Sequence, residues 1–224
     1  MEKIKHVLYW FKVNSLTYCL GYIFRTLFIN RIERSKLKNR NFSVLSQNCV
    51  GCVMLHDLGQ PFNSPTVNLY MSSPDYIIFL ERLTEFIGQK LTFVESDKRY
   101  PKGILFYDAD GEKKSISLYF PHDNDTGKIQ NDWLRRSERV HYDNLYVIAT
   151  DRDGLTMDIL ERFSMLPYKH KVLLSSKPYP EFSFVQYFKQ YKNLDQLTSM
   201  VDIVSIFGKR EYGQGWDYVS WLNS

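Results

Sequence analysis

The chain has 224 residues, of which 44% are hydrophobic, and a formal net charge of +4. This length is enough to bury a full core in one domain with an appendage. The sequence contains no run of 18 uncharged apolar residues, so we expect no membrane-spanning helix. We also expect no cleavable signal peptide at its start. Three cysteines, an odd number, predict a cytoplasmic protein without a disulfide framework.

The first 40 residues are strongly basic. They hold nine Lys or Arg against two Glu, a net charge of +7, so the other residues carry −3 of the total of +4. Leu16, Leu20, Ile23 and Leu27 recur here at helical spacing. A basic amphipathic helix is typical of contact with the inner face of an anionic membrane, and the alternative is a helix packed on the protein's own core. The rest of the chain is mildly acidic and shows no nucleic-acid-binding module, so nucleic acid is not expected as a partner.

The predicted elements follow in chain order. Hydrophobic periodicity and turn signals predict helices over 3–13, 15–37, 74–87, 126–138, 155–163, 182–190, 193–200 and 217–222. Strands are predicted over 42–46, 91–95, 103–107, 115–120, 145–149, 171–174 and 201–205. Ser73 is the expected cap of the helix over 74–87. The turn at Asp108-Ala109-Asp110-Gly111 predicts a hairpin between two of the strands.

The order strand, short loop, helix, strand over 145–174 is typical of a parallel βαβ crossover. The predicted fold class is therefore α/β, with a mostly parallel Rossmann-like sheet flanked by helices. Residues 1–40 are expected to form a basic amphipathic helical arm. Residues 41–224 are expected to form a single α/β domain.

Small polar residues follow the first strand of this domain. Asn48, Ser64 and Asn68 lie within some twenty positions of its end. Ligands of open α/β sheets bind outside the carboxyl ends of the strands, so these side chains are candidates for binding a sugar or a nucleotide. Their other interpretation is ordinary turn chemistry.

Several motifs resemble one known family, the exopolysaccharide biosynthesis proteins of unknown function. The resemblance covers roughly residues 42–175, with a weaker echo near the end of the chain. It is carried by Asn48-Cys49-Val50-Gly51, Ser64-Pro65-Thr66-Val67-Asn68-Leu69, Tyr100-Pro101, Phe120 and His122, Trp133 with Arg135-Arg136, Asp143-Asn144-Leu145 and Thr150-Asp151-Arg152-Asp153-Gly154. Val50 and Cys52 stand where this family has an aromatic residue and a second glycine. The resemblance implies work on capsule and surface polysaccharide, but it assigns no catalytic residue.

Two carboxylates, Asp151 and Asp153, follow the strand over 145–149. Such a pair holds a divalent cation, Mg²⁺ or Mn²⁺, and through it the diphosphate of a sugar nucleotide. In the other interpretation Asp153 caps the helix that begins near Leu155.

Three further residues are candidates for the site. Arg135 and Arg136 are suited to phosphate oxygens. Asp132 and Arg136, and likewise Arg135 and Arg139, are four positions apart, which also fits a solvated helix face. His122, between Pro121 and Asp123, is a candidate base for an acceptor hydroxyl, or else a structural histidine.

Cys49-Val50-Gly51-Cys52 also has the spacing of a redox dithiol. With His56 it is half of a zinc site, but no second pair of ligands is visible. Two buried free cysteines are the plainer interpretation.

These features predict an enzyme of surface-polysaccharide assembly that transfers a sugar or a related substituent from a nucleotide-linked donor to a lipid-linked saccharide. Asp151 would hold the donor, His122 would be the base, and Asn48, Ser64 and Asn68 would shape the pocket. One alternative is a non-catalytic carbohydrate-binding or scaffold subunit. Another is a small-group transferase that uses a different donor.

Overall fold

The computed structural model describes residues 16–96 and 98–224, and the helix predicted over 3–13 lies outside them. The chain divides into two compact units. Unit 1 contains the chain up to Arg40 together with His56–Gln60 and Ser199–Ser224, and unit 2 contains Asn41–Leu55 and Pro61–Thr198. The predicted arm over 1–40 and domain over 41–224 stay a prediction, and in the structure residues 56–60 and 199–224 group with the first 40 residues.

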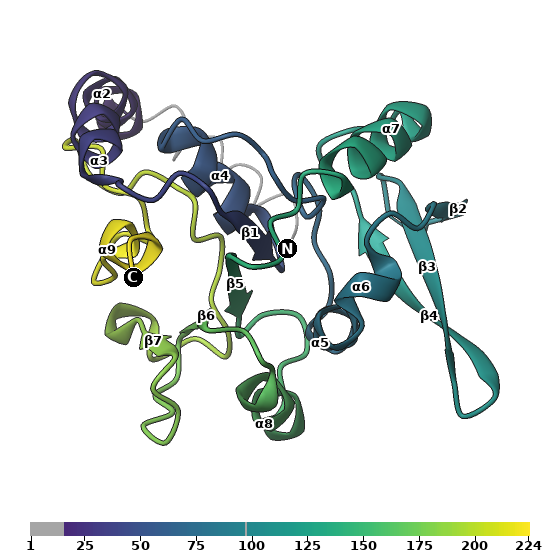
Figure 1. The fold of residues 1–224 in the computed structure, drawn as a ribbon. Coiled ribbons are helices and arrows are strands. Elements are labelled where there is room, and N and C mark those ends of the chain that lie inside the picture. Colours follow the sequence, from purple (N-terminus) through teal and green to yellow (C-terminus); the bar gives the residue numbers. More distant parts are fainter. Residues whose placement is uncertain (1–15, 97) are drawn as a thin grey trace. The chain divides into compact units, whose positions relative to one another are not determined.

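Unit 2 is built on a parallel sheet of four strands in the order β1-β5-β6-β7 (Figure 1). The strands are β1 (Ser43–Ser46), β5 (Leu145–Thr150), β6 (His170–Ser175) and β7 (Val185–Tyr187). All three pairings are parallel. Every residue of β1 and β5 is buried, which fits strands covered on both faces. The α/β prediction is confirmed.

A second sheet in unit 2 is antiparallel, in the order β2-β3-β4. Its strands are β2 (Thr92–Val94), β3 (Lys102–Ala109) and β4 (Glu112–Tyr119). Asp110 and Gly111 both adopt positive φ, of 57° and 75°, between β3 and β4. This is the conformation that a two-residue hairpin turn needs, so the predicted hairpin is confirmed.

The helices of unit 2 are α4 (Cys49–Asp57, whose last two residues belong to unit 1), α5 (Ser73–Glu81), α6 (Leu83–Phe86), α7 (Thr126–Ser137) and α8 (Met157–Met165). One hydrophobic core joins them to both sheets. It includes Leu45, Val147 and Leu173 of the parallel sheet, Leu105, Ile116 and Leu118 of the antiparallel sheet, Phe79 of α5, Trp133 of α7 and Phe163 of α8.

Several local predictions for unit 2 were wrong. The cap of α5 is Ser72, whose hydroxyl accepts the amide of Asp75, and not Ser73. The helix predicted over 74–87 is interrupted at Arg82. The segment over 182–190 contains strand β7 and the start of a short 3₁₀ turn (Lys189–Tyr191), and 193–200 is not helical. Tertiary pairing with β6 outweighs the local helical pattern at 185–187.

Unit 1 contains one continuous helical run and a short C-terminal helix. The run consists of α2 (Leu16–Phe24), a π-helical turn (Arg25–Ile29) and α3 (Asn30–Lys36), and the last helix is α9 (Tyr218–Leu222), capped by Asp217. The strand predicted over 201–205 is reduced to one bridge, between Ile203 and Arg210.

Polar contacts attach this helical run to the rest of unit 1. The buried carboxylate of Asp57 accepts hydrogen bonds from Arg25 Nε at 2.7 Å and from Arg210 Nε at 2.8 Å. Arg25 also forms an ion pair with Glu33 at 2.8 Å. A Cβ added at Gly21 would lie 2.2 Å from the carbonyl oxygen of Ser205, so only glycine permits this close approach.

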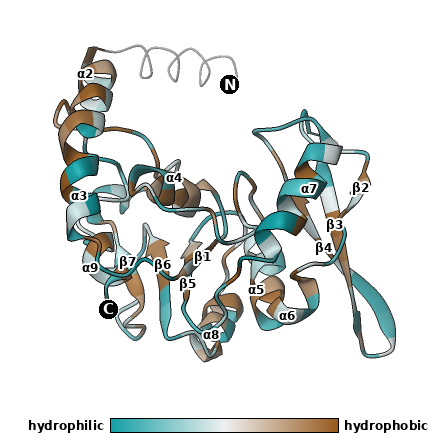
Figure 2. Ribbon diagram, turned by 45° about the horizontal axis from the view of Figure 1, so that its top comes forward, coloured by the Kyte–Doolittle hydropathy of each residue, from teal (hydrophilic) through white to brown (hydrophobic). Residues whose placement is uncertain are grey.

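The outward face of the same run is apolar. Leu16, Leu20, Ile23, Leu27 and Ile32 are each at least 45% exposed, while Gly21 and Arg25 are buried. Figure 2 shows the hydrophobic colouring along α2. The usual arrangement of an amphipathic helix, with its apolar face inward, is therefore reversed here. Across residues 16–96 and 98–224, no helix has both the length and the apolar character needed to cross a bilayer.

Candidate functional site

The turn from β1 into α4 positions Cys49 at the first residue of a helix. The side chains of Asn48 and Ser46 accept the amides of Val50 and Gly51, at 3.3 and 3.1 Å, and so cap the first turn. Gly51 allows the helix to pass close to β1, since an added Cβ would lie 2.6 Å from that of Ser46. The first-turn amides of a helix favour negative charge at this position.

His122 comes after the last strand of the antiparallel sheet and lies next to Cys49. It follows the end of β4, which a bridge between Tyr70 and Tyr119 holds in place. Its Nε2 lies 3.2 Å from Cys49 Sγ. The two residues are 73 positions apart in the chain, so the fold has brought them together.

A second thiol adjoins this pair. The buried Cys52 lies one helical turn further along α4, and its Sγ donates to the carbonyl oxygen of Cys49 at 3.2 Å. A hydrogen bond from the Cys49 thiol, together with the backbone amides of Asn68 and Val53, lowers the pKa of Cys52 to about 7. The same hydrogen bond and burial raise the pKa of Cys49. The two sulfurs therefore share one proton near neutral pH.

This arrangement has the parts of an activated nucleophile. A thiol becomes reactive when a neighbouring base removes its proton and when nearby dipoles stabilise the thiolate. His122 can supply the first of these and the first turn of α4 the second, and both act against the raised pKa of Cys49. Cys49 is less deeply buried than Cys52, which makes Cys49 the sulfur available to a substrate.

The pKa of the cysteine pair gives a test of this geometry. Alkylation of the pair by iodoacetamide should rise with pH through a midpoint near 7, whereas an ordinary thiol titrates at about 8.5. Cys49→Ala removes the hydrogen bond that lowers the pKa of Cys52, so the midpoint of the remaining thiol should move upward. Peptide mass spectrometry would follow each cysteine separately, with the exposed Cys19 as an internal reference. A midpoint unchanged by Cys49→Ala would contradict the shared proton.

Two of the predicted binding residues lie beside the cysteines. Asn68 is exposed and has a positive φ of 60°. Its Oδ1 accepts a hydrogen bond from the Cys52 thiol at 3.8 Å. Arg136 pairs with Asp132 at 3.1 Å and stacks over the ring of Phe62. Asn68 and Arg136 also line a small cavity of about 30 Å³, enough for a water or two but not for a sugar.

Three other predicted residues have partners within unit 2, and their binding roles stay predictions. Asn48 donates to Thr150 Oγ1 at 3.0 Å and joins the ends of β1 and β5. Ser64 is fully buried and donates to the carbonyl oxygen of Val44 at 2.6 Å. Arg135 is exposed and pairs with Asp132, as a solvated helix face would.

Asp151 already has partners for both of its carboxylate oxygens. Oδ2 accepts the amide of Ser176 at 2.6 Å, its hydroxyl at 2.7 Å and the hydroxyl of Ser175 at 3.2 Å, while Oδ1 accepts the amide of Leu197 at 2.8 Å. These bonds tie the end of β5 to the end of β6 and to the loop that follows β7. Asp151 is only 6% exposed, and its carboxylate holds these three segments together.

Asp153 does not cap α8, because Thr156 accepts the amide of Ile159 instead. Asp153 stands at φ 60°, followed by Gly154 at 98°, and its amide is bound by Gln196. In the part of the chain that the structure describes, no three His, Cys, Asp or Glu side chains form a group that could hold a metal ion. A metal at Asp151 and Asp153 stays a prediction.

The Cys49 and His122 pairing was missed from the sequence, because nothing in the spacing of two residues 73 positions apart marks them as neighbours. The usable signal was that both lie in segments that resemble the same family. The helix over 49–57 was also missed, since its apolar residues show almost no one-sided pattern.

Comparisons with known proteins identify a family without a known activity. A family model described as "Domain of unknown function (DUF1919)" matches residues 21–223. An uncharacterised protein of Haemophilus influenzae is 40% identical over 196 residues, which cover 88% of this chain and 91% of that protein. The chain belongs to the DUF1919 family.

Proposed function

We propose that this member of the DUF1919 family is a group-transfer enzyme with Cys49 as its nucleophile and His122 as its base. The single observation that carries the proposal is the 3.2 Å separation of Cys49 Sγ and His122 Nε2 at the first turn of α4. Such a pair suits transfer of an acyl-type substituent from an activated donor to a hydroxyl group. The resemblance to exopolysaccharide biosynthesis proteins supports a saccharide as the acceptor.

The reaction proceeds in two balanced steps. Cys49 Sγ attacks the acyl carbon of the donor while His122 Nε2 accepts the thiol proton; the bond to the leaving group breaks, and the leaving group departs with that proton. A thioester remains on Cys49. An acceptor hydroxyl then gives its proton to His122 and bonds to the acyl carbon, the carbon–sulfur bond breaks, and the sulfur regains the proton.

Transfer of a sugar from a nucleotide-linked donor is less well supported. That reaction would need Asp151 and Asp153 to hold Mg²⁺ or Mn²⁺ and the donor diphosphate. The oxygens of Asp151 are engaged by Ser175, Ser176 and Leu197 instead. A cysteine nucleophile also offers little to a sugar nucleotide, whose leaving group needs charge neutralisation.

A minimal activated ester tests the proposal. Incubation with p-nitrophenyl acetate should release p-nitrophenolate in a burst and leave one acetyl group on Cys49, which peptide mass spectrometry would locate. Addition of a hydroxyl-rich saccharide should discharge that acetyl group onto the sugar. A Cys19→Ser variant is the control for non-specific acetylation of an exposed thiol.

Two results would count against the enzyme. Absence of acetyl-Cys49 would exclude it as the nucleophile. Retention of the acetyl group in the presence of every saccharide tried, with saccharide binding intact, would favour the non-catalytic binding subunit.

The apolar outward face of α2 and α3 supports a position at an anionic membrane surface. Its exposed leucines and isoleucines belong to the basic first 40 residues, which carry a net charge of +7. Apolar side chains enter the interface while basic ones attract anionic lipid headgroups. A lipid-linked saccharide would be presented at the same surface.

We expect the full chain to co-sediment with vesicles of phosphatidylcholine and phosphatidylglycerol, less so as salt rises. Ile23→Glu with Leu27→Glu should release it by placing two charges on the exposed face. Met157→Glu with Met165→Glu, at exposed positions of unit 2, is the matched control and should still bind. Equal sedimentation of both double variants would contradict docking through this face. It would leave self-association as the reason for the exposed apolar side chains.

A further inference from the structure

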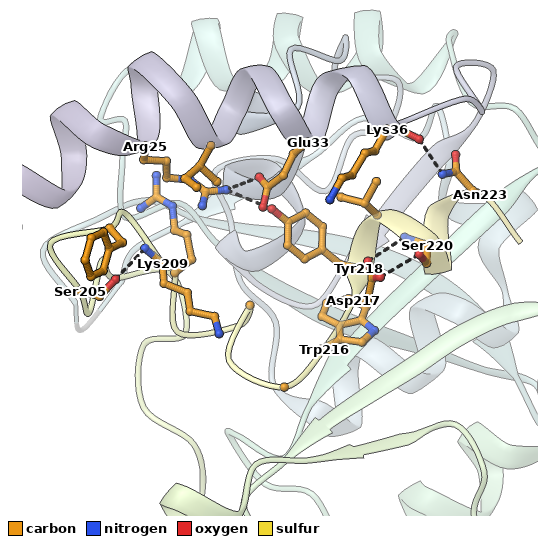
Figure 3. Close-up of a pocket in the computed structure, with 16 residues that line it drawn as sticks. Arg25, Glu33, Lys36, Ser205, Lys209, Trp216, Asp217, Tyr218, Ser220 and Asn223 are labelled. Atoms are coloured by element: carbon orange, nitrogen blue, oxygen red, sulfur yellow. Dashed lines mark hydrogen bonds and ion pairs between the residues drawn. The ribbon is translucent and has the colours of Figure 1, made fainter.

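Unit 1 contains a cavity of about 960 Å³, at the upper end of the size range of small-molecule sites. The inward side of the helical run from Arg25 to Lys36 forms one wall, and the C-terminal segment from Ser205 to Asn223 forms the other (Figure 3). All of its lining residues belong to unit 1, and none takes part in the Cys49 site.

The buried charges of this cavity neutralise one another. Arg25 and Arg210 are matched by Asp57 and Glu33 through ion pairs of 2.7 to 2.8 Å. Arg25 further donates to the carbonyl oxygen of Gly208 at 3.0 Å. These four side chains are committed to the fold and leave no net charge of their own.

Two lysines of the lining, Lys36 and Lys209, form no such ion pair, although the charge of Lys36 helps to lower the pKa of Asp217. Within the described part of unit 1, no carboxylate oxygen lies within 4 Å of the ammonium group of Lys36 or Lys209. Asp217, the other acid of the lining, accepts the amide and hydroxyl of Ser220 at 3.0 and 2.8 Å as the cap of α9. Figure 3 shows Lys36 on the helical wall and Lys209 on the C-terminal wall. With Asp217 counted, these groups leave one excess positive charge, and the two lysine ammonium groups come from separate walls.

The lining of the cavity also includes an aromatic side chain. Trp216 lines the cavity and packs against Tyr218 and Trp221, with ring centroids 6.0 and 5.2 Å apart. A tryptophan held in this way offers a rigid apolar surface to a ring, and ammonium groups bind phosphate oxygens by charge-assisted hydrogen bonds.

We propose that this cavity binds a phosphorylated sugar, with its phosphate at Lys36 and Lys209 and its ring against Trp216. The sugar phosphate is either a free metabolite or the headgroup of a lipid. The site does not depend on the chemistry of Cys49, and its failure would leave that chemistry untouched.

Direct binding to the full chain tests the site. Calorimetry with glucose 1-phosphate should give saturable binding that weakens with salt, and neutral glucose should bind far more weakly. Lys36→Gln and Lys209→Gln should each weaken binding by about tenfold. Trp216→Phe, which keeps a ring of smaller area, should weaken it less. Lys38→Gln removes the same charge from the same unit but lies outside the cavity, and it should bind as the wild type does.

A second arm distinguishes the source of the phosphate. Vesicles of phosphatidylcholine with phosphatidylinositol present an inositol phosphate on a lipid. The protein should co-sediment with these vesicles more than with phosphatidylcholine vesicles alone if the ligand is a lipid headgroup. The difference should then be lost in the Lys36→Gln and Lys209→Gln double variant. Binding of glucose 1-phosphate alone would identify a free solute.

Absence of saturable binding to both probes would overturn the proposal, as would equal affinities in the wild type and the double lysine variant. The melting temperature of each variant must match that of the wild type. Should the double variant unfold, the single variants Lys36→Gln and Lys209→Gln carry the test, and wild-type affinity in both would place the ligand elsewhere.

Discussion

Cys49→Ser should reduce the rate of acetyl transfer from p-nitrophenyl acetate to a saccharide by on the order of 10³-fold or more. The hydroxyl is far harder to deprotonate than the thiol, so His122 can no longer generate a useful nucleophile. The measurement is the burst of p-nitrophenolate together with the mass of the protein before and after the reaction. Cys52→Ser is the matched control at the neighbouring position, and acetyl-Cys49 should still form in it.

His122→Asn separates the role of the base from that of the nucleophile. This variant keeps a hydrogen-bonding side chain beside Cys49 but removes the proton acceptor, so acetyl transfer should fall by about 10²- to 10⁴-fold. Raising the pH should restore part of the rate, since hydroxide then ionises the thiol directly. A rate that stays at the wild-type level in His122→Asn would remove His122 from the mechanism while leaving Cys49 in place.

Asp57→Asn should destabilise unit 1 by about 3–5 kcal/mol. Asp57 is buried between Arg25 and Arg210, and burial alone would raise its pKa. The hydrogen bonds and charges of Arg210 and Arg25 hold the pKa below its ordinary value instead. An amide cannot neutralise the two guanidinium groups, so Arg210 would remain buried without an anion and Arg25 would keep only Glu33 as its anionic partner.

Hydrogen exchange of unit 1 and the melting temperature of the whole chain would measure this loss. Asp158→Asn is the control, because that carboxylate is 78% exposed and its ion pair with Arg162 is long, at 3.9 Å. The lowered pKa of Asp57 also predicts the effect of acid on the wild type. Its stabilising contribution is fully present above about pH 3.9, the ordinary value, and is lost as the pH falls through the lower value of the folded state. A wild-type melting temperature for Asp57→Asn would contradict the role of this carboxylate.

The sequence predicted the elements whose pattern is local. The strand over 145–149 is a continuous apolar run, and the helix over 126–138 has its apolar residues on one side, so both were placed within a residue or two. The helices over 182–190 and 193–200 failed, because strand pairing with β6 and hydrogen bonds to the loop at Leu197 decide the structure there. Those partners lie elsewhere in the chain, and no local pattern reports them.

The candidate site was predictable only in its parts. His122, Asn68 and Arg136 were singled out, and the fold places them around the cysteines. Asp151 looked like a ligand because a carboxylate after a strand is equally suited to binding a metal and to accepting loop amides. The four donors that occupy its oxygens in the structure come from residues 24 to 46 positions later.

The composition of unit 1 has a consequence for how the chain folds during its synthesis. Unit 1 joins residues up to Arg40 with residues 56–60 and 199–224, whereas the contacts of unit 2 close within residues 41–198. Contacts between distant parts of a chain form late, because the intervening loop must be ordered first. A ribosome that has released residue 198 has therefore supplied all of unit 2 and both acidic partners of Arg25, Glu33 and Asp57. It has not yet supplied Arg210, the second partner of Asp57, or Gly208 and Tyr218, which bind the Arg25 guanidinium group. Until then the helical run from α2 to α3 lacks these C-terminal partners and the close contact of Gly21 with Ser205, so we expect it to be more exposed to chaperones and proteases than in the finished protein.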